Sequence, residues 1–228
     1  MNSVKSNKLI HWWEKIYQWR FYILIVCILP TLSLPGFFDA DTNRRIIWPI
    51  SRTLILFGCT NVIMGMRRGR LLVFLLGLVS TGSGWLTSSE IDPSTAALIG
   101  LTLFGLFIAI VTWECLRQIH LNYEVDLHTI VGSMAGFMLI GIIGGVLFTV
   151  MHVAYPHSFS NVPAGLQGVS ELVYLSFITV LTVGYGDIVP ITEASRFLSI
   201  LLGLVGQFYI VVLMAILVGK YLFKIRME

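Results

Sequence analysis

Long apolar segments separated by short polar stretches make up most of this chain. Six of them are close to the roughly 20 residues that a helix needs to cross a bilayer. They cover residues 21–38, 46–66, 71–87, 94–116, 129–153 and 193–223. Small residues dilute the third segment at 80–84, and such residues favour close helix packing. The pattern predicts an all-α membrane protein with six transmembrane helices, and Pro49 suits the first turn of the second helix.

Composition leads to the same class. Of 228 residues, 56% are hydrophobic and 12% are charged, and the mean hydropathy is +0.85. Soluble domains are far less apolar. The net charge of +3 indicates no nucleic-acid partner, and Cys27, Cys59 and Cys115 lie in apolar runs that offer no disulfide framework. The sequence has no nucleophile–base pair, phosphate loop or metal-ligand cluster, so we expect neither an enzyme nor a cofactor.

Charge placement predicts the topology. Basic residues gather at 67–70, at Arg117 and in the tail at 220–226, and six spans put all of these on the side of the amino terminus. Most acidic residues fall on the other side. By the positive-inside bias, we expect a multi-pass protein of the plasma or inner membrane with both termini in the cytoplasm. Residues 1–20 mix cations with tryptophans, which is typical of an amphipathic segment that contacts membrane lipids.

The fourth segment bears on voltage sensing. Residues 94–116 contain no basic residue. Charges that move across the membrane field confer voltage dependence, so steep voltage gating is not expected. Arg52 and Glu114 are interpreted as helix-end residues that snorkel to the surface. The stretch that follows, 117–128, is predicted to be a cytoplasmic linker, either an interfacial helix or a plain loop.

A short apolar segment lies between the fifth and sixth spans. Turn formers are dense in residues 155–168, which predicts an exposed loop. Residues 169–181 are too short to span a bilayer, so they predict a re-entrant helix. Ser170 offers an N-cap for it, and Glu171 falls in its first turn, where a negative charge is favoured.

The sequence T-V-G-Y-G follows at 182–186, which we call the TVGYG loop. Gly184 and Gly186 stand at alternate positions, and glycine adopts positive φ at little cost. Alternation between left-handed and ordinary backbone turns successive carbonyl groups to one side. The loop is therefore expected to present a row of carbonyl oxygens.

The chain from 129 to 223 resembles the pore module of potassium channels, small bacterial six-span members in particular. The resemblance rests on TVGYGD at 182–187 and on Leu-Val-Gly-Gln at 204–207. It implies an outer helix, a re-entrant pore helix, the TVGYG loop as selectivity filter, and an inner helix, assembled as a homotetramer. Residues 21–116 resemble the leading four-helix domain of such channels by span count alone. Residues 224–228 are read as a short cytoplasmic tail.

The resemblance also assigns the ion-binding groups. Potassium is then the permeant ion, and it binds carbonyl groups of the loop. These residues are Thr182, Val183, Gly184 and Tyr185, with Gly186 completing the loop.

Around the loop, this chain departs from its relatives. Many relatives carry tryptophans on the pore helix where this chain has Tyr174 and Leu175, and some carry an acid where Ile178 stands. Leucine cannot donate a hydrogen bond, so Thr179 is expected to hold the Tyr185 hydroxyl. Without the acid, Asp187 is expected either to pair with Arg196 or to stay solvated, at a mouth that also carries Glu171 and Glu193.

The inner helix carries the expected cavity and gate. Gly206 stands where relatives have a hinge glycine, and close packing against the outer helix is the alternative. Gln207 is expected to face a water-filled cavity. Met214 and Val218 are expected to form an apolar constriction that closes by dewetting.

Two other functions stay open on the sequence. A weakly selective cation channel is the first, although Tyr185 argues against it. A non-conducting membrane sensor or scaffold built on a pore module is the second, although the TVGYG motif shows no decay. No motif names the gating stimulus, so a separate regulatory subunit also stays open as a partner.

Replacing both Met214 and Val218 by serine tests the expected constriction. Hydroxyl groups hold water where methyl and thioether groups exclude it, so we expect the open probability of single channels to rise. Planar-bilayer recording measures this, with Gly82→Ser as the control in the leading domain. An unchanged open probability would remove the gate from these two positions.

Overall fold

The fold is described from a computed structural model, which defines residues 18–66, 68–88, 95–121 and 127–227. Six of its helices are long and apolar enough to cross a membrane, so the protein is a multi-pass membrane protein. The prediction of six spans is confirmed at this level. The long helices are α2 (Arg20–Ser33), α4 (Trp48–Ile63), α5 (Arg70–Thr87), α6 (Thr95–Leu121), α7 (Leu127–Ala154) and α9 (Glu193–Met227).

Shorter elements connect the spans. They are η1 (Leu34–Phe37), α3 (Ala40–Thr42), η2 (Asn43–Ile47), η3 (Gly165–Gly168) and α8 (Val169–Val180). Pro49 lies in the first turn of α4, as predicted, and the five residues before α4 form a π-helical turn. The proline ring crowds the carbonyl group four residues earlier, and a widened turn there relieves that contact.

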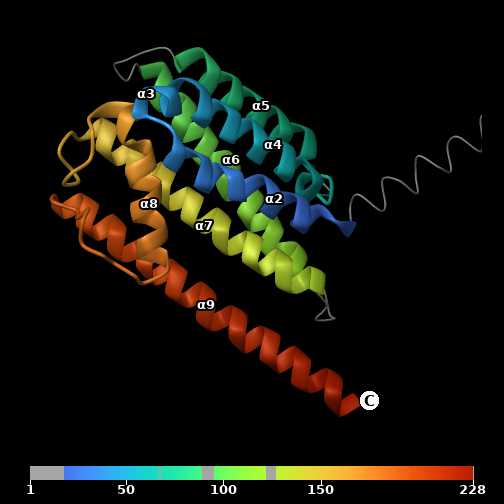
Figure 1. The fold of residues 1–228 in the computed structure, drawn as a ribbon. Helices are drawn as coiled ribbons and strands as arrows, with labels where there is room; N and C mark the ends of the chain where they lie inside the picture. Colours follow the sequence, from blue (N-terminus) through green and yellow to red (C-terminus); the bar gives the residue numbers. More distant parts are fainter. Residues whose placement is uncertain (1–17, 67, 89–94, 122–126, 228) are drawn as a thin grey trace, which may run out of the picture.

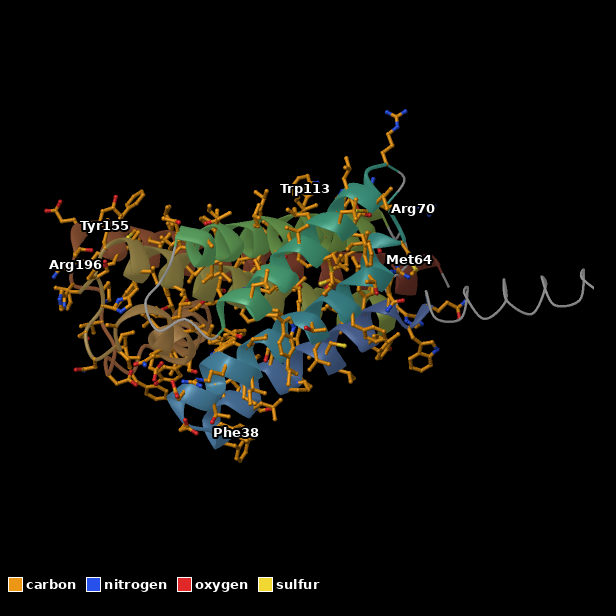
Figure 2. The ribbon with its side chains drawn as sticks, turned by 90° about the horizontal axis from the view of Figure 1, so that it is seen from above. Phe38, Met64, Arg70, Trp113, Tyr155 and Arg196 are labelled. Atoms are coloured by element: carbon orange, nitrogen blue, oxygen red, sulfur yellow. The ribbon has the colours of Figure 1, made fainter. Side chains whose placement is uncertain are left out.

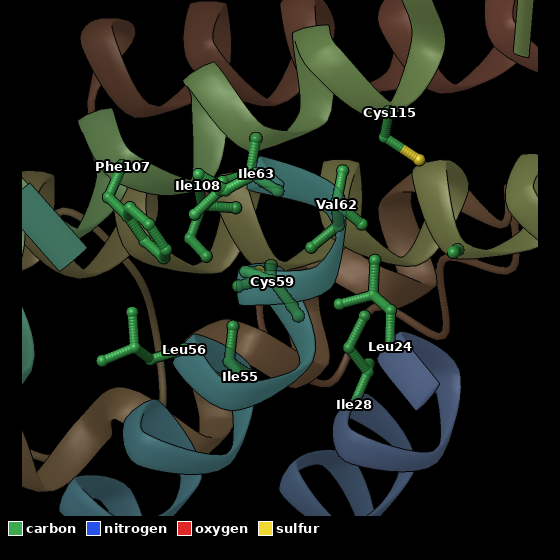
Figure 3. Packing of buried hydrophobic residues seen from close by; sticks show 14 of the residues in the cluster. Leu24, Ile28, Ile55, Leu56, Cys59, Val62, Ile63, Phe107, Ile108 and Cys115 are labelled. Atoms are coloured by element: carbon green, nitrogen blue, oxygen red, sulfur yellow. The ribbon is translucent and has the colours of Figure 1, made fainter. Parts of the chain in front are cut away.

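Helices α2, α4, α5, α6 and α7 lie side by side, while α9 leaves the bundle and extends beyond it (Figure 1). The period of the apolar positions explains the packing of α2. Its residues Phe21, Leu24 and Ile28 are fully buried, at spacings of three and four that keep them on one face. Figure 3 shows Leu24 and Ile28 facing Ile55 and Cys59 of α4. A second apolar cluster joins α7, α8 and α9.

The small residues of α5 let neighbouring helices approach closely. A Cβ atom on Gly77 would lie 2.6 Å from side-chain atoms of Leu56 and of Phe107. Ser80 is fully buried and donates a hydrogen bond to the Gly77 carbonyl. The prediction of close packing for this segment is confirmed.

The bundle has two distinct ends. Phe38, Tyr155 and Arg196 lie at one end, which we call the loop end, and Met64 and Arg70 lie at the other (Figure 2). Which end faces the cytoplasm remains a prediction from the sequence.

Two helices continue past predicted domain boundaries, which themselves stay predictions. Helix α6 continues to Leu121, four residues beyond the predicted start of the linker at 117, and residues 122–126 lie outside the described part of the chain. Helix α9 continues to Met227, into the predicted tail at 224–228. Apolar character ended the predicted spans, whereas a helix continues through polar residues as long as its backbone hydrogen bonds are made.

The interpretation of Glu114 as a snorkelling residue is also wrong. Glu114 is 3% exposed and accepts hydrogen bonds from Arg117 and Gln118, each at 2.8 Å. Gln118 also donates to the Val62 carbonyl at 2.9 Å and accepts from Arg20 at 2.9 Å. This network joins α6, α4 and α2, and it satisfies a carboxylate that would be costly to bury alone.

Gly77→Val tests the packing of α5. Two added methyl groups would collide with Leu56 and Phe107, and overpacking of this kind costs about 1–3 kcal/mol. We expect a lower midpoint of thermal unfolding in detergent, followed by intrinsic fluorescence. Gly82→Val is the matched control, because a Cβ atom at Gly82 meets nothing within 4 Å. Equal shifts for both variants would contradict the packing role.

Candidate functional site

The helix before the TVGYG loop, α8, sits against a glycine-lined face of α7. A Cβ atom on Gly141 would lie 2.6 Å from the Phe177 ring, and one on Gly145 would lie 2.9 Å from the Cα atom of Val173. Ser176 is fully buried and donates to the Gly141 carbonyl at 2.6 Å. Backbone contact and this hydrogen bond together fix the position of α8 on α7.

The start of α8 differs from the prediction in its cap. Gly168 is the N-cap residue and makes no side-chain hydrogen bond, while Ser170 is already the second helical residue. The predicted N-cap at Ser170 is therefore wrong, because a 3₁₀ turn, η3, leads directly into the helix. Glu171 does lie in the first turn.

Backbone carbonyl groups at the end of α8 accept hydrogen bonds from the loop. The amide groups of Val183 and Gly184 both donate to the Ile178 carbonyl, at 2.9 and 3.2 Å, and the Thr182 amide donates to the Thr179 carbonyl at 3.1 Å. Carbonyl groups of the last helical turn lack partners within a helix. Here they anchor the first half of the loop.

Positive φ recurs at every second residue of the loop. The φ angles are 59° at Thr182, 54° at Gly184 and 80° at Gly186. The glycine spacing predicted the last two, and Thr182 extends the alternation by one position. A β-branched residue with positive φ is a true outlier, so the surrounding contacts must hold Thr182 in place.

The loop is open to its surroundings in the single chain. Tyr185 is 73% exposed and Val183 is 46% exposed. Beside it, α9 exposes a row of large apolar side chains. They are Phe197, Ile200, Leu204 and Phe208. These surfaces require an apolar cover, which lipid or another protein chain can supply.

Asp187, directly after the loop, has partners that the sequence did not identify. Its Oδ2 atom accepts a hydrogen bond from the Tyr174 hydroxyl at 2.8 Å. Its backbone carbonyl accepts one from the side-chain amide of Asn161, also at 2.8 Å. Arg196 instead donates to the Pro190 carbonyl at 3.4 Å, so the predicted Asp187–Arg196 pair is wrong. The hydrogen bond to Asp187 raises the pKa of the Tyr174 hydroxyl.

The segment before α8 pairs with the residues that follow the loop, through an isolated bridge between Phe159 and Pro190. Ser158 and Phe159 are at most 3% exposed, which corrects the prediction of an exposed loop there. The Ser158 carbonyl accepts from the Ile191 amide at 2.9 Å, and the Ser160 amide donates to the Val189 carbonyl at 2.9 Å. These bonds pair two segments that are about 30 residues apart, a spacing that no local motif announces.

The remaining predicted residues lie around α8 and α9. The Thr179 hydroxyl donates to the Leu175 carbonyl at 2.7 Å, and no hydrogen bond joins it to Tyr185 in the described chain. A Cβ atom on Gly206 would lie 2.7 Å from a Val180 methyl group and 3.1 Å from the Val180 carbonyl oxygen. Gly206 therefore packs closely, but against α8 rather than the predicted outer helix. Gln207 is exposed.

Met214 and Val218 belong to α9, but their side chains lie outside the described part of the structure. The dewetting gate predicted for them stays a prediction.

Comparison with known proteins assigns the second half of the chain. Residues 136–223 match the ion-channel family, whose description reads "Ion channel". A protein from Oryza sativa subsp. japonica, named two pore potassium channel c, is 31% identical over 86 residues. The match covers 38% of this chain and 18% of the rice protein. No solved structure matches the chain significantly.

The matched region contains α8, the TVGYG loop and α9 through residue 223. This region is similar to the ion-channel family, whose members are not enzymes. The leading helices α2, α4, α5 and α6 lie outside the match, and the chain spans less than a fifth of the length of the rice relative.

Tyr174→Phe tests the hydrogen bond to Asp187. Phenylalanine keeps the ring but cannot donate, so the Asp187 carboxylate loses this hydrogen bond and the end of the loop is held less firmly. We expect open lifetimes in planar bilayers to shorten several-fold. Tyr155→Phe is the control, because the Tyr155 side chain is 66% exposed. Unaltered lifetimes in Tyr174→Phe would show that Asp187 is held by its backbone alone.

Proposed function

We propose that the protein is a homotetrameric, potassium-selective channel that conducts ions passively through the TVGYG loop. Four copies of the loop would surround one axis, and the carbonyl groups of Thr182, Val183, Gly184 and Tyr185 would replace the hydration shell of K⁺. The ion-channel match over 136–223 supports ion conduction. The likeness to a protein named as a potassium channel supports the choice of ion.

One observation carries the proposal: the alternation of φ along residues 182–186. Values between 54° and 80° at Thr182, Gly184 and Gly186 are separated by residues with ordinary φ. In such a backbone, neighbouring carbonyl groups point the same way instead of opposing each other. A continuous row of uncharged oxygens suits a dehydrated monovalent cation.

The exposed surfaces support assembly. Val183 is 46% and Tyr185 73% exposed in one chain, next to the apolar row on α9. Backbone that is neither helix nor sheet persists at membrane depth only inside protein or along water. Neighbouring copies would bury the loop, and the Thr179 oxygen, which can still accept a hydrogen bond, would then be available to Tyr185 of an adjacent copy.

Gating and placement follow from charge. The part of α6 inside the membrane carries no basic residue before Arg117, so steep voltage dependence is not proposed. Both termini are placed in the cytoplasm by the positive-inside bias, with the channel in the plasma or inner membrane and lipids around it. Potassium is the permeant ion, and no cofactor is proposed.

Gly184→Ala tests the filter. A left-handed backbone costs alanine about 1–2 kcal/mol, so the alternation at φ 54° should fail. The measurement is K⁺ efflux from liposomes holding the purified protein, with Na⁺ as the competing ion. We expect selective K⁺ efflux from the unaltered protein and at least a roughly tenfold loss in Gly184→Ala. Gly82→Ala should behave as the unaltered protein does, because Gly82 has ordinary φ and open space around it.

Three outcomes would count against the proposal. Equal permeability for Na⁺ and K⁺ would favour a weakly selective cation channel. No flux under any voltage or pH would favour a sensor or scaffold. A monomer or dimer by mass measurement in detergent would exclude the tetramer.

A further inference from the structure

Arg52 is the fifth residue of α4 and lies at a junction of three helices. Its Nη1 atom lies 2.6 Å from the position that a Cβ atom on Gly84 of α5 would take. Its Cζ atom lies 5.1 Å from the centre of the Phe104 ring of α6. The interpretation of Arg52 as a snorkelling helix-end residue is therefore wrong. The guanidinium group is held between α4, α5 and α6.

This guanidinium group has no hydrogen-bonded or charged partner among the described residues. Its situation contrasts with that of Glu114, which is buried and accepts three hydrogen bonds, two from Arg117 and one from Gln118. Arginine presents five N–H donors and stays protonated. A cation inside a membrane-spanning segment, at Arg45–Ile63, is costly without a partner and is a functional feature by default.

Two cavities lie against Arg52. The first is a cleft of about 40 Å³, lined by Trp48, Thr87 and Ser88, by Leu166 of η3 and by Val169, the first residue of α8. The second, also of about 40 Å³, lies between α2, α4, α6, α7 and α8. Among the described residues, no acidic residue lines either cavity, and Arg52 is the one charged residue of the two linings.

Other groups in the two cavities also favour an anion. Ser51 is 1% exposed, lines the second cavity, and its hydroxyl group has no hydrogen-bond partner. Trp48 lines both cavities, and an indole N–H group can only donate. Val169 is the first residue of α8 and lies at the positive end of that helix. The nearest helical acid, Glu171, lines neither cavity.

The depth of the cleft indicates where the anion comes from. Arg52 stands seven residues into the span that begins at Arg45, about 10 Å along a helix. Trp85 is 48% exposed beside it and donates to the Thr53 hydroxyl at 3.1 Å. Half-exposed tryptophan is typical of the membrane–water interface, where lipid phosphate groups lie.

We propose that the cleft at Arg52 binds a phosphate-class oxyanion, supplied by the headgroup of an anionic phospholipid at the loop end of the bundle. The bound phosphate would bridge α4 and α5 of the leading domain to Leu166 of η3 and Val169 of α8. It would thereby connect the leading helices to the helix that carries the TVGYG loop. The binding does not depend on the proposed conduction, so each can fail alone.

Lipid retention in native mass spectrometry tests the proposal on the full-length protein. The protein is stripped of lipid in detergent and titrated with phosphatidylglycerol, phosphatidylcholine or diacylglycerol. We expect phosphatidylglycerol to be retained best and diacylglycerol, which lacks phosphate, least. In Arg52→Gln, retention of phosphatidylglycerol should weaken at least about tenfold, because a charge-assisted fork of hydrogen bonds is lost.

Two further variants separate the site from general charge effects. Arg45→Gln removes an exposed cation that pairs with Asp41 at 3.4 Å, and it should retain lipid as the unaltered protein does. Gly84→Val keeps Arg52 but fills the space beside Nη1, so retention should again fall. Arg52→Lys should restore part of the binding, because lysine keeps the charge and loses the fork. If Arg52→Gln does not fold, Gly84→Val and Arg52→Lys still decide the question.

A second experiment distinguishes a lipid headgroup from free phosphate as the source of the anion. Inorganic phosphate is titrated in detergent without lipid, and the thermal midpoint is followed. A rise that Arg52→Gln abolishes would support the oxyanion site with a free anion as its ligand. Equal retention of phosphatidylglycerol by Arg52→Gln and the unaltered protein, with no response to phosphate, would overturn the proposal.

A carboxylate group of the protein itself is the remaining candidate ligand for Arg52 in the cleft. Glu90 and Asp92 follow Ser88 closely in the sequence. If Glu90→Gln with Asp92→Asn lowered the thermal midpoint only when Arg52 was present, an internal ion pair would fill the cleft, and the lipid proposal would be wrong.

Discussion

The TVGYG loop depends on contacts that hold a disfavoured backbone. Thr182 has a φ of 59° although its side chain is β-branched, and such a residue costs on the order of 1–3 kcal/mol. Two sets of hydrogen bonds supply the restraint. The Ile178 carbonyl accepts amide donors from the first half of the loop, while Tyr174 and Asn161 hold Asp187 at its end. The loop is thus fixed on both sides by α8 and by the segment that precedes α8.

These restraints depend on how firmly α8 itself is held in position. Glycine on α7 and Gly206 on α9 bring backbones into contact with α8, and Ser176 adds a buried hydrogen bond to α7. In α5 of the leading domain, Gly77 has the same role, because side chains of Leu56 and Phe107 pack directly over it. Lipid provides no hydrophobic drive for helices to associate, so close packing of small residues and interhelical hydrogen bonds take over that function. Both halves of the protein are built in this way.

Glu114 and Arg52, two charged residues inside the leading domain, have different surroundings. Glu114 is embedded in a network that joins three helices at the end opposite the TVGYG loop. Arg52 lies toward the loop end, over an aromatic ring and between two cavities, without an ion partner in the described chain. A satisfied buried charge stabilises the arrangement of helices, whereas an unsatisfied one requires a ligand. This contrast assigns the first to structure and the second to binding.

The sequence by itself determined the six spans, the short apolar helix between the fifth and the sixth, and the positive φ of Gly184 and Gly186. Each of these follows from local quantities. They are the length of an apolar run compared with the thickness of the bilayer, and the absence of a side chain at glycine. Only the tertiary structure decided that Tyr174, and not Arg196, holds Asp187, and that Gly206 meets α8. It also showed that Glu114 and Arg52 have different surroundings, although both were interpreted from the sequence as helix-end residues. Such pairings join residues from different helices, and hydrophobic periodicity carries no information about which polar groups will meet across them.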